Sequence, residues 1–111
     1  MPGKTLCTLL LSAVALVGSA RLVTAQQTGN VAAGHRLART WCVTCHVVDR
    51  DQSTGASTGA PSFPAIAQMS STTPWSLRVF LQTPHGRMPD LHLSVAEMQD
   101  ISAYILSLRK R

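Results

Sequence analysis

The 111-residue sequence is poor in acidic residues, in aromatic residues and in cysteine, and it shows neither strand-like alternation nor an internal repeat. Ten basic and five acidic residues give a formal net charge of +5. The basic residues are dispersed except in the tail Arg109 to Arg111, so the sequence gives little support to nucleic-acid binding. The length allows one domain at most, and the absence of a strand pattern predicts an all-α fold.

The sequence also lacks an apolar run of the ~20 residues that a membrane-spanning helix needs. Its longest apolar stretch, Leu6 to Val17, lies near a positively charged N-terminus. Small residues at Val23-Thr24-Ala25 suit cleavage by a signal peptidase, and Gly18-Ser19-Ala20 is a second possible cleavage site. We therefore expect residues 1–25 to be a cleaved secretory signal peptide and residues 26–111 to be the mature domain, with no stable membrane insertion. An uncleaved anchor is the alternative.

Cleavage after Ala25 changes both the charge and the cysteine count of the chain. It removes Lys4 and Arg21, which leaves eight basic and five acidic residues and a formal charge of +3. It also removes Cys7, so the mature chain keeps two cysteines, Cys42 and Cys45. Whatever the cysteines do in this protein therefore depends on one short stretch of the sequence.

That stretch reads Cys42-Val43-Thr44-Cys45-His46, and C-x-x-C-H is the signature of covalent haem attachment. Each cysteine can bond one haem vinyl group, and the imidazole of His46 can bind the iron. Three alternatives remain open on the motif alone. An exported cysteine pair can form a disulfide, a dithiol oxidoreductase of the thioredoxin type would need strands, and a zinc site would need two further ligands that no second C-x-x-C or H-x-x-x-H supplies.

Three helices are predicted around this motif, separated by long loops. Asn30 is a good N-cap for a helix over Val31 to Trp41. Thr73 followed by Pro74 predicts a second helix that ends at Gln82 before Pro84. The sequence Ser94-Val95-Ala96-Glu97 is a capping box for the last helix. Its apolar stripe is formed by Val95, Met98, Ile101, Ile105 and Leu108.

The segments between the helices are expected to be loops with a few inward side chains. Pro61 and Pro64 are expected to prevent a regular helix there, although Phe63 and Ile66 are apolar enough to turn inward. In the second helix Leu77, Phe80 and Leu81 are expected to face inward. Gly34 in the first helix predicts a close approach by another backbone or ring.

Three short helices in an 86-residue mature chain enclose little apolar core. A buried porphyrin would supply the missing apolar surface and contribute on the order of 10 kcal/mol at about 25 cal/mol per Å². The second axial ligand of its iron has six neutral candidates: His35, Met69, His85, Met88, His92 and Met98. Met88 is favoured because Pro89 follows it in a loop, and its thioether would raise the reduction potential.

The set of motifs from Asn30 to Leu108 resembles a class I cytochrome c. The resemblance rests on Gly34 in a first helix, on the C-x-x-C-H stretch, on Gly59-Ala60-Pro61-Ser62-Phe63, on Arg87-Met88-Pro89, and on the final helix with Tyr104. It implies an all-α fold of three main short helices and long loops wrapped around one covalently attached haem c.

The resemblance also implies roles for single residues. It makes Cys42 and Cys45 the thioether donors, His46 the proximal iron ligand and Met88 the distal one. It makes the carbonyl of Pro61 a hydrogen-bond acceptor that orients the proximal histidine. It further implies that the Tyr104 ring rests on Gly34 where the first and last helices cross, and that the Trp75 N–H reaches a haem propionate.

The implied function is that of a non-enzymatic, monomeric electron carrier in the bacterial periplasm, shuttling single electrons between exported redox proteins such as a dehydrogenase, an oxidase or a membrane cytochrome complex. A dedicated cytochrome c subunit of a periplasmic dehydrogenase or oxidase is the alternative. Two features depart from the family. Leu37 and Ala38 stand where an aromatic residue is common, and the mature chain keeps Lys110 as its one lysine, which argues against strong electrostatic steering.

Overall fold

The computed structural model of the chain describes residues 28–52 and 59–110, and the regular elements in these two stretches are all helical. The helices are α1 (Val31–Leu37), α2 (Phe63–Gln68), α3 (Pro74–Gln82) and α4 (Val95–Ser107), and a π-helical turn η1 (Ala38–Cys42) continues α1. Between residues 28 and 110 the described chain contains no strand, only an isolated bridge between His85 and Met88. The predicted all-α fold is confirmed, whereas the predicted signal peptide lies outside the described residues.

Each α-helix begins at a residue whose side chain accepts a hydrogen bond from the backbone of the first turn. Asn30 accepts from the N–H of Ala33 at 2.8 Å. Thr73 and Ser94 form capping boxes with Ser76 and Glu97 respectively. The three helix starts that the sequence predicted are therefore confirmed, because a cap needs only residues three positions apart.

The helix α2 is a correction, because Pro61 and Pro64 were expected to prevent a helix in this segment. Pro61 precedes the N-cap Ser62, and Pro64 falls in the first turn. The N–H groups of a first turn have no partner within the helix, so proline there removes no hydrogen bond. Ser62 accepts from the N–H of Ala65 at 3.2 Å and supplies the cap that the sequence reading had missed.

The first helix also differs from the prediction of a single α-helix over residues 31–41. After Leu37 the chain widens into η1, in which the N–H of Val43 donates to the carbonyl of Ala38 five residues earlier, at 3.0 Å. A π-turn holds more than four residues. Counting from Ala38, the residue that returns to the inner face is therefore Cys42, four positions on, and not Trp41, three positions on. Cys42 is accordingly buried beside Ala38, and Trp41, which was expected to face inward, is 55% exposed.

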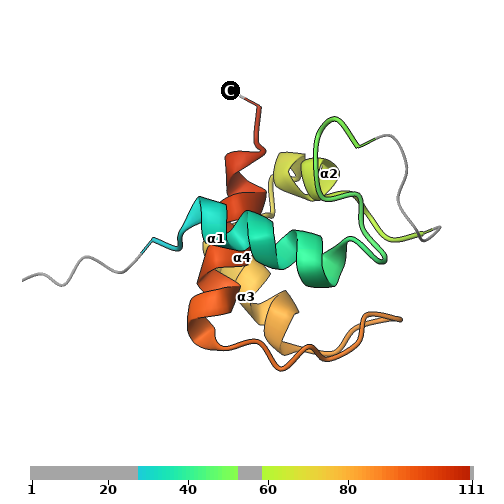
Figure 1. Cartoon of the computed structure of the whole chain (residues 1–111), viewed down its shortest axis with the longest axis vertical. Coiled ribbons are helices and arrows are strands. Elements are labelled where there is room, and N and C mark those ends of the chain that lie inside the picture. The colour runs from blue at the N-terminus through green and yellow to red at the C-terminus, as the bar shows by residue number, and fades with distance from the viewer. Residues whose placement is uncertain (1–27, 53–58, 111) are drawn as a thin grey trace, which may run out of the picture.

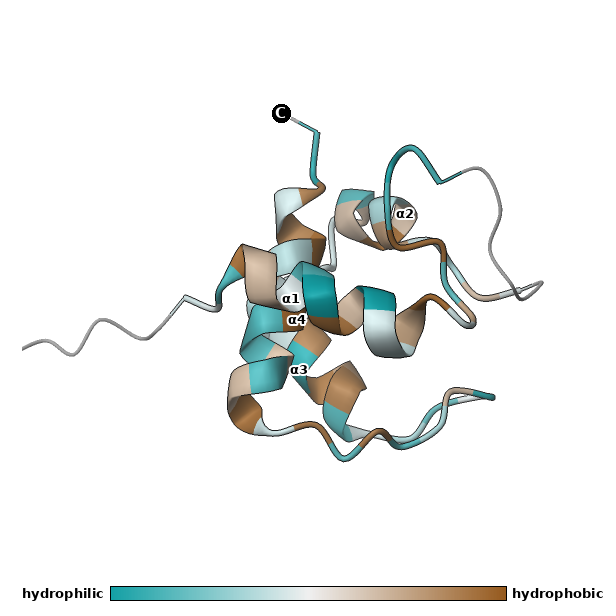
Figure 2. Cartoon of the chain, viewed as in Figure 1, coloured by the Kyte–Doolittle hydropathy of each residue, from teal (hydrophilic) through white to brown (hydrophobic). Residues whose placement is uncertain are grey.

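The core lies where the first and last helices cross. In Figure 1, α1 passes across α4, with α3 and α2 packed against other parts of α4. Figure 2 shows apolar stretches of α1, α3 and α4 meeting at this centre, while the C-terminal residues are hydrophilic. Buried side chains from η1, α2, α3, α4 and the chain beside them form one cluster: Ala38, Cys42, Val48, Phe63, Ala67, Leu77, Ile101, Tyr104, Ile105 and Leu108.

Gly34 allows this crossing to be close. A Cβ atom at Gly34 would lie 1.9 Å from the carbonyl oxygen of Asp100 and 2.9 Å from the Cβ of Tyr104. The N–H of Asn30 also donates to the Asp100 carboxylate at 2.6 Å. The predicted close approach to Gly34 is confirmed, and the backbone of α4 is the nearest part of the neighbour.

Some expected inward residues are exposed. Leu77 is buried and Leu81 is partly buried, as predicted, but Phe80 is 59% exposed and packs edge-on against the His85 ring at 5.0 Å. Val95 at the start of α4 is 47% exposed. Both residues lie at helix ends, where the apolar stripe runs past the neighbouring helices, so the stripe was predicted too long.

The C-terminal end of the described chain is tied to two earlier segments. The Arg109 guanidinium donates to the carbonyls of Ala67 at 2.9 Å and Thr72 at 2.7 Å. The carbonyl of Leu108 accepts from the side chains of Arg50 and Gln68. The helices described between residues 28 and 110 are each too short or too polar to cross a membrane.

Candidate haem attachment site

The C-x-x-C-H motif is folded into one tight turn at the end of η1. The carbonyl of Cys42 accepts from the N–H of Cys45 at 3.0 Å and from that of His46 at 2.8 Å. Cys42 is buried, and Cys45 and His46 are partly buried. Neither cysteine is in a disulfide, so the structure presents two free thiols and one imidazole from a single turn.

The ring of His46 is held in one tautomer. Its Nδ1 lies 2.6 Å from the carbonyl oxygen of Pro61. A carbonyl can only accept, so Nδ1 carries the proton and Nε2 keeps a free lone pair. The ring also packs against Phe63 at 5.4 Å, and the N–H of Phe63 donates to the carbonyl of Val47 at 2.9 Å. This is the arrangement that orients a metal-binding imidazole.

The pKa of the Cys42 thiol is shifted in the opposite direction from that of the reactive thiol of a dithiol oxidoreductase. Its burial, and secondly the nearby Cys45, raise the pKa of Cys42 to about 11. Disulfide exchange requires a thiolate, which reactive cysteines obtain from exposure and a lowered pKa. The part of the chain that the structure describes also contains no cluster of three His, Cys, Asp or Glu side chains that could hold a metal ion.

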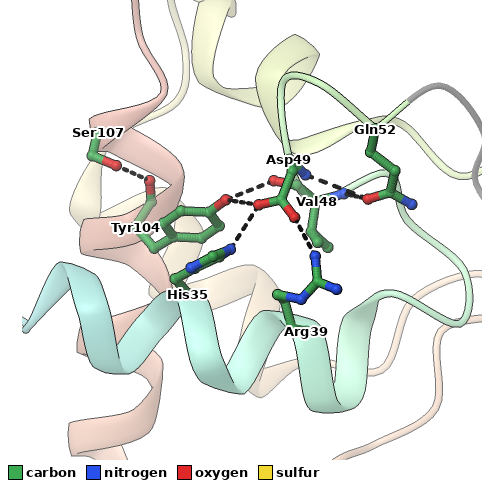
Figure 3. A network of polar contacts seen from close by, with 7 residues as sticks. All are labelled: His35, Arg39, Val48, Asp49, Gln52, Tyr104 and Ser107. Carbon is green, nitrogen blue, oxygen red and sulfur yellow. Dashed lines mark hydrogen bonds and ion pairs between the residues drawn. The ribbon is translucent and has the colours of Figure 1, made fainter.

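The segment after the motif is anchored by a polar network around Asp49, shown in Figure 3. The Asp49 carboxylate accepts from Tyr104 Oη at 2.6 Å, His35 Nε2 at 2.7 Å and Arg39 Nη1 at 2.6 Å. The Tyr104 hydroxyl is shared with the carbonyl of Val48 at 2.9 Å. These bonds lower the pKa of Asp49, with the Tyr104 hydrogen bond as the largest cause. Three helical residues thus hold the chain three residues after His46.

The sequence did not predict this network, and the network changes the interpretation of His35 and Tyr104. His35 was considered as an iron ligand on an exposed face, but its Nε2 bonds Asp49. The Tyr104 ring, which was expected to rest on Gly34, is tilted against the His35 ring at a centroid distance of 4.7 Å, and the Tyr104 Cβ is among the atoms nearest to Gly34. The one signal in the sequence was an acidic residue close after the motif.

The other candidates for an iron ligand differ in their surroundings. Met98 is 3% exposed in the core, and Met69 is 48% exposed at the end of α2. The side chain of His92 is 85% exposed and its ring lies 3.4 Å from Asp90. Met88 is partly buried and lines a small pocket with Phe80, Leu81 and His85 among others.

The structure brings Cys42, Cys45, His46 and Pro61 together, while Met88 lies on a separate loop. In Figure 1, the chain after η1 and the loop between α3 and α4 extend to the same side of the α1–α4 crossing. Trp75, which was expected to reach a propionate, is 70% exposed, and its ring lies 5.7 Å from the Arg78 guanidinium.

Comparisons with known proteins agree with this site. Residues 29–105 match the family described as cytochrome c oxidase, cbb3-type, subunit III. Cytochrome c-552 of Bradyrhizobium diazoefficiens is 46% identical over 79 residues, which cover 69% of this chain and 75% of that protein. No solved structure matches the chain. The helical fold and these matches define a class I c-type cytochrome. Within that class, the chain belongs to the family described as cytochrome c oxidase, cbb3-type, subunit III.

The residues of the motif fit the haem c that this family implies. A single turn presents two thiols that are not bonded to each other and an imidazole with a free Nε2. These three groups are the donor set that a covalent haem requires. The protein is therefore a haem c electron carrier, as the resemblance implied, and electron transport is its class of function.

Proposed function

We propose that this cytochrome is a soluble one-electron carrier in which Cys42 and Cys45 bind the haem vinyl groups and His46 and Met88 bind the iron. Bound haem supplies a single iron that alternates between the ferric and ferrous states. The observation that carries the proposal is the bond from His46 Nδ1 to the Pro61 carbonyl. It orients the ring and leaves Nε2 as the nitrogen that faces the metal.

Met88 is assigned as the second ligand in preference to three other candidates. Met98 belongs to the core, His35 bonds Asp49, and His92 is exposed beside Asp90. Met88 is partly buried on a short turn, and the Pro89 ring after it restricts the backbone beside its thioether. A thioether opposite an imidazole raises the reduction potential, and two protein ligands leave no open position for a substrate. These properties suit a carrier and not a catalyst.

The proposal includes export. Residues 1–25 would be removed as a signal peptide and residues 26–111 would act as a monomer in the bacterial periplasm, between exported redox partners. The runner-up is a dedicated subunit of an oxidase or dehydrogenase complex, which is favoured by the oxidase-subunit description of the matching family. Co-purification with one complex at high salt supports the subunit, whereas salt-sensitive reduction by several partners supports the shuttle.

Replacing Met88 by alanine tests the ligand assignment. We expect the sulfur-to-iron band at the red edge of the visible spectrum to disappear and the reduction potential to fall, because the thioether is lost. Met69→Ala is the matched control, since Met69 is an exposed methionine at the end of α2. Persistence of the band in Met88→Ala, or its loss in Met69→Ala, would overturn the assignment.

A further inference from the structure

The turn that carries Met88 also presents a histidine in register with it. Residues 85–88 form a tight hairpin in which the N–H of Met88 donates to the carbonyl of His85 at 3.0 Å. The two residues face each other in an antiparallel bridge. Gly86 at the first central position has φ +53°, a backbone conformation that glycine adopts without strain.

Residues paired across an antiparallel bridge project their side chains from the same face, with Cβ atoms about 4.5–5.5 Å apart. The pocket at this turn agrees with that rule, because His85 and Met88 line it together with Phe80 and Leu81. A group bound by the Met88 sulfur would therefore have the His85 ring as its immediate neighbour.

The His85 ring is prepared in the same way as that of His46. Its Nδ1 lies 2.8 Å from the carbonyl of Thr83, so Nδ1 carries the proton and Nε2 keeps its lone pair. The edge-on contact with Phe80, at 5.0 Å between centroids, holds the ring on its other side. A histidine that donates one ring N–H to a backbone carbonyl is the arrangement found for metal ligands.

We propose that His85 is a latent ligand of the haem iron, which binds through Nε2 when the sulfur of Met88 dissociates. The proposal rests on the assignment of Met88 made above. In the exchange one Fe–S bond breaks and one Fe–N bond forms, and the iron keeps its oxidation state. Because Nδ1 is engaged by the Thr83 carbonyl, Nε2 is the ring nitrogen that would bind. The product has two imidazole ligands, remains closed to small molecules, and has a lower reduction potential because it has lost the thioether.

His92 provides the matched comparison within the same loop. It is four residues beyond Met88 and is also an imidazole, but its side chain is 85% exposed and its ring lies beside Asp90. It is outside both the hairpin bridge and the pocket that His85 and Met88 share. We therefore expect its removal to leave the ligand exchange unchanged.

The test uses the haem-loaded protein with Met88→Ala alone and combined with His85→Ala, His85→Gln or His92→Ala. Paramagnetic resonance of the ferric protein reports the spin state and the ligand type. We expect Met88→Ala to lose the sulfur-to-iron band and stay low-spin with two imidazole ligands. Removing His85 as well should convert the iron to high spin, with glutamine preserving side-chain bulk in case the alanine variant does not fold. The His92→Ala combination should stay low-spin.

The outcomes separate this proposal from the one on which it rests. A Met88→Ala protein that loses the band and becomes high-spin overturns the role of His85 while leaving Met88 as the ligand. The role of His85 is also overturned if Met88→Ala combined with His85→Ala stays low-spin, or if Met88→Ala combined with His92→Ala becomes high-spin. Survival of the band in Met88→Ala overturns the Met88 assignment itself and the latent ligand with it.

Discussion

Replacing Gly34 by alanine should have two opposite effects on the free energy of unfolding. The higher helix propensity of alanine raises it, and the steric contact of the new methyl group with α4 lowers it. The new methyl group would lie 1.9 Å from the carbonyl oxygen of Asp100, 2.4 Å from its carbonyl carbon and 2.9 Å from the Cβ of Tyr104. Two of these atoms belong to the backbone of α4 and cannot rotate away. The helices α1 and α4 would have to separate by about 1 Å before the closest contact reached 3.0 Å, below which real Cβ atoms essentially never approach.

The magnitude follows from three terms. Alanine gains about 1 kcal/mol over glycine in helix propensity. Overpacking of a closed contact costs about 1–3 kcal/mol. The bond from Asn30 to the Asp100 carboxylate, of a kind worth about 1.5–3 kcal/mol, lies at the same crossing and weakens as the helices separate. We expect the free energy of unfolding to fall by about 2 kcal/mol in total.

Guanidinium unfolding of the haem-loaded protein, followed by far-ultraviolet circular dichroism, measures this change. The variants Arg36→Ala and Arg36→Gly form the matched control, because Arg36 is an exposed residue in α1. There alanine should be the more stable of the two, by about 1 kcal/mol. If Gly34→Ala proves as stable as the parent or more stable, following the order at Arg36, the crossing is not limited by steric contact and the reasoning is refuted.

Two further predictions concern Asp49 and Ser94. The lowered pKa of Asp49 means that its bonds contribute fully above the unfolded-state value of ~3.9 and are lost as pH falls through the folded-state value. Asp49→Asn should therefore be less stable than the parent at pH 7, and urea unfolding should show a smaller difference at pH 3; an equal difference at both pH values would contradict the network. Ser94→Ala should cost about 1 kcal/mol by removing the cap of α4. Thermal unfolding should show this loss but none for Ser70→Ala, an exposed serine outside the helices.

The helix starts were predictable because each depends on residues three positions apart. Three helices were predicted from their N-cap residues in this way: Asn30, Thr73 and Ser94. The helix α2 was not predicted because proline was judged by its effect in a helix interior, while Pro64 lies in the first turn. The π-turn was not predicted because five residues cannot distinguish a period of 3.6 from a longer one.

The candidate site divides along the same line. The C-x-x-C-H turn is contiguous, so the sequence identifies it directly. The contact of His46 with Pro61 spans 15 residues and was expected from the family resemblance alone. Asp49 meets Tyr104, 55 residues away, and no periodicity or motif indicates that meeting. The exposure of Phe80 likewise depends on how far the neighbouring helices extend, which periodicity alone does not indicate.

The crossing of α1 and α4 has a consequence for how the chain folds. The bond between Asn30 and Asp100 joins residues 70 positions apart, and the C-x-x-C-H turn lies inside the loop that it closes. Most helical proteins fold fast because their contacts are local, whereas loop-closure entropy slows the formation of distant ones. In this all-helical domain the first and last helices are in close contact. Its folding rate should therefore resemble that of mixed α/β domains more than that of helical bundles.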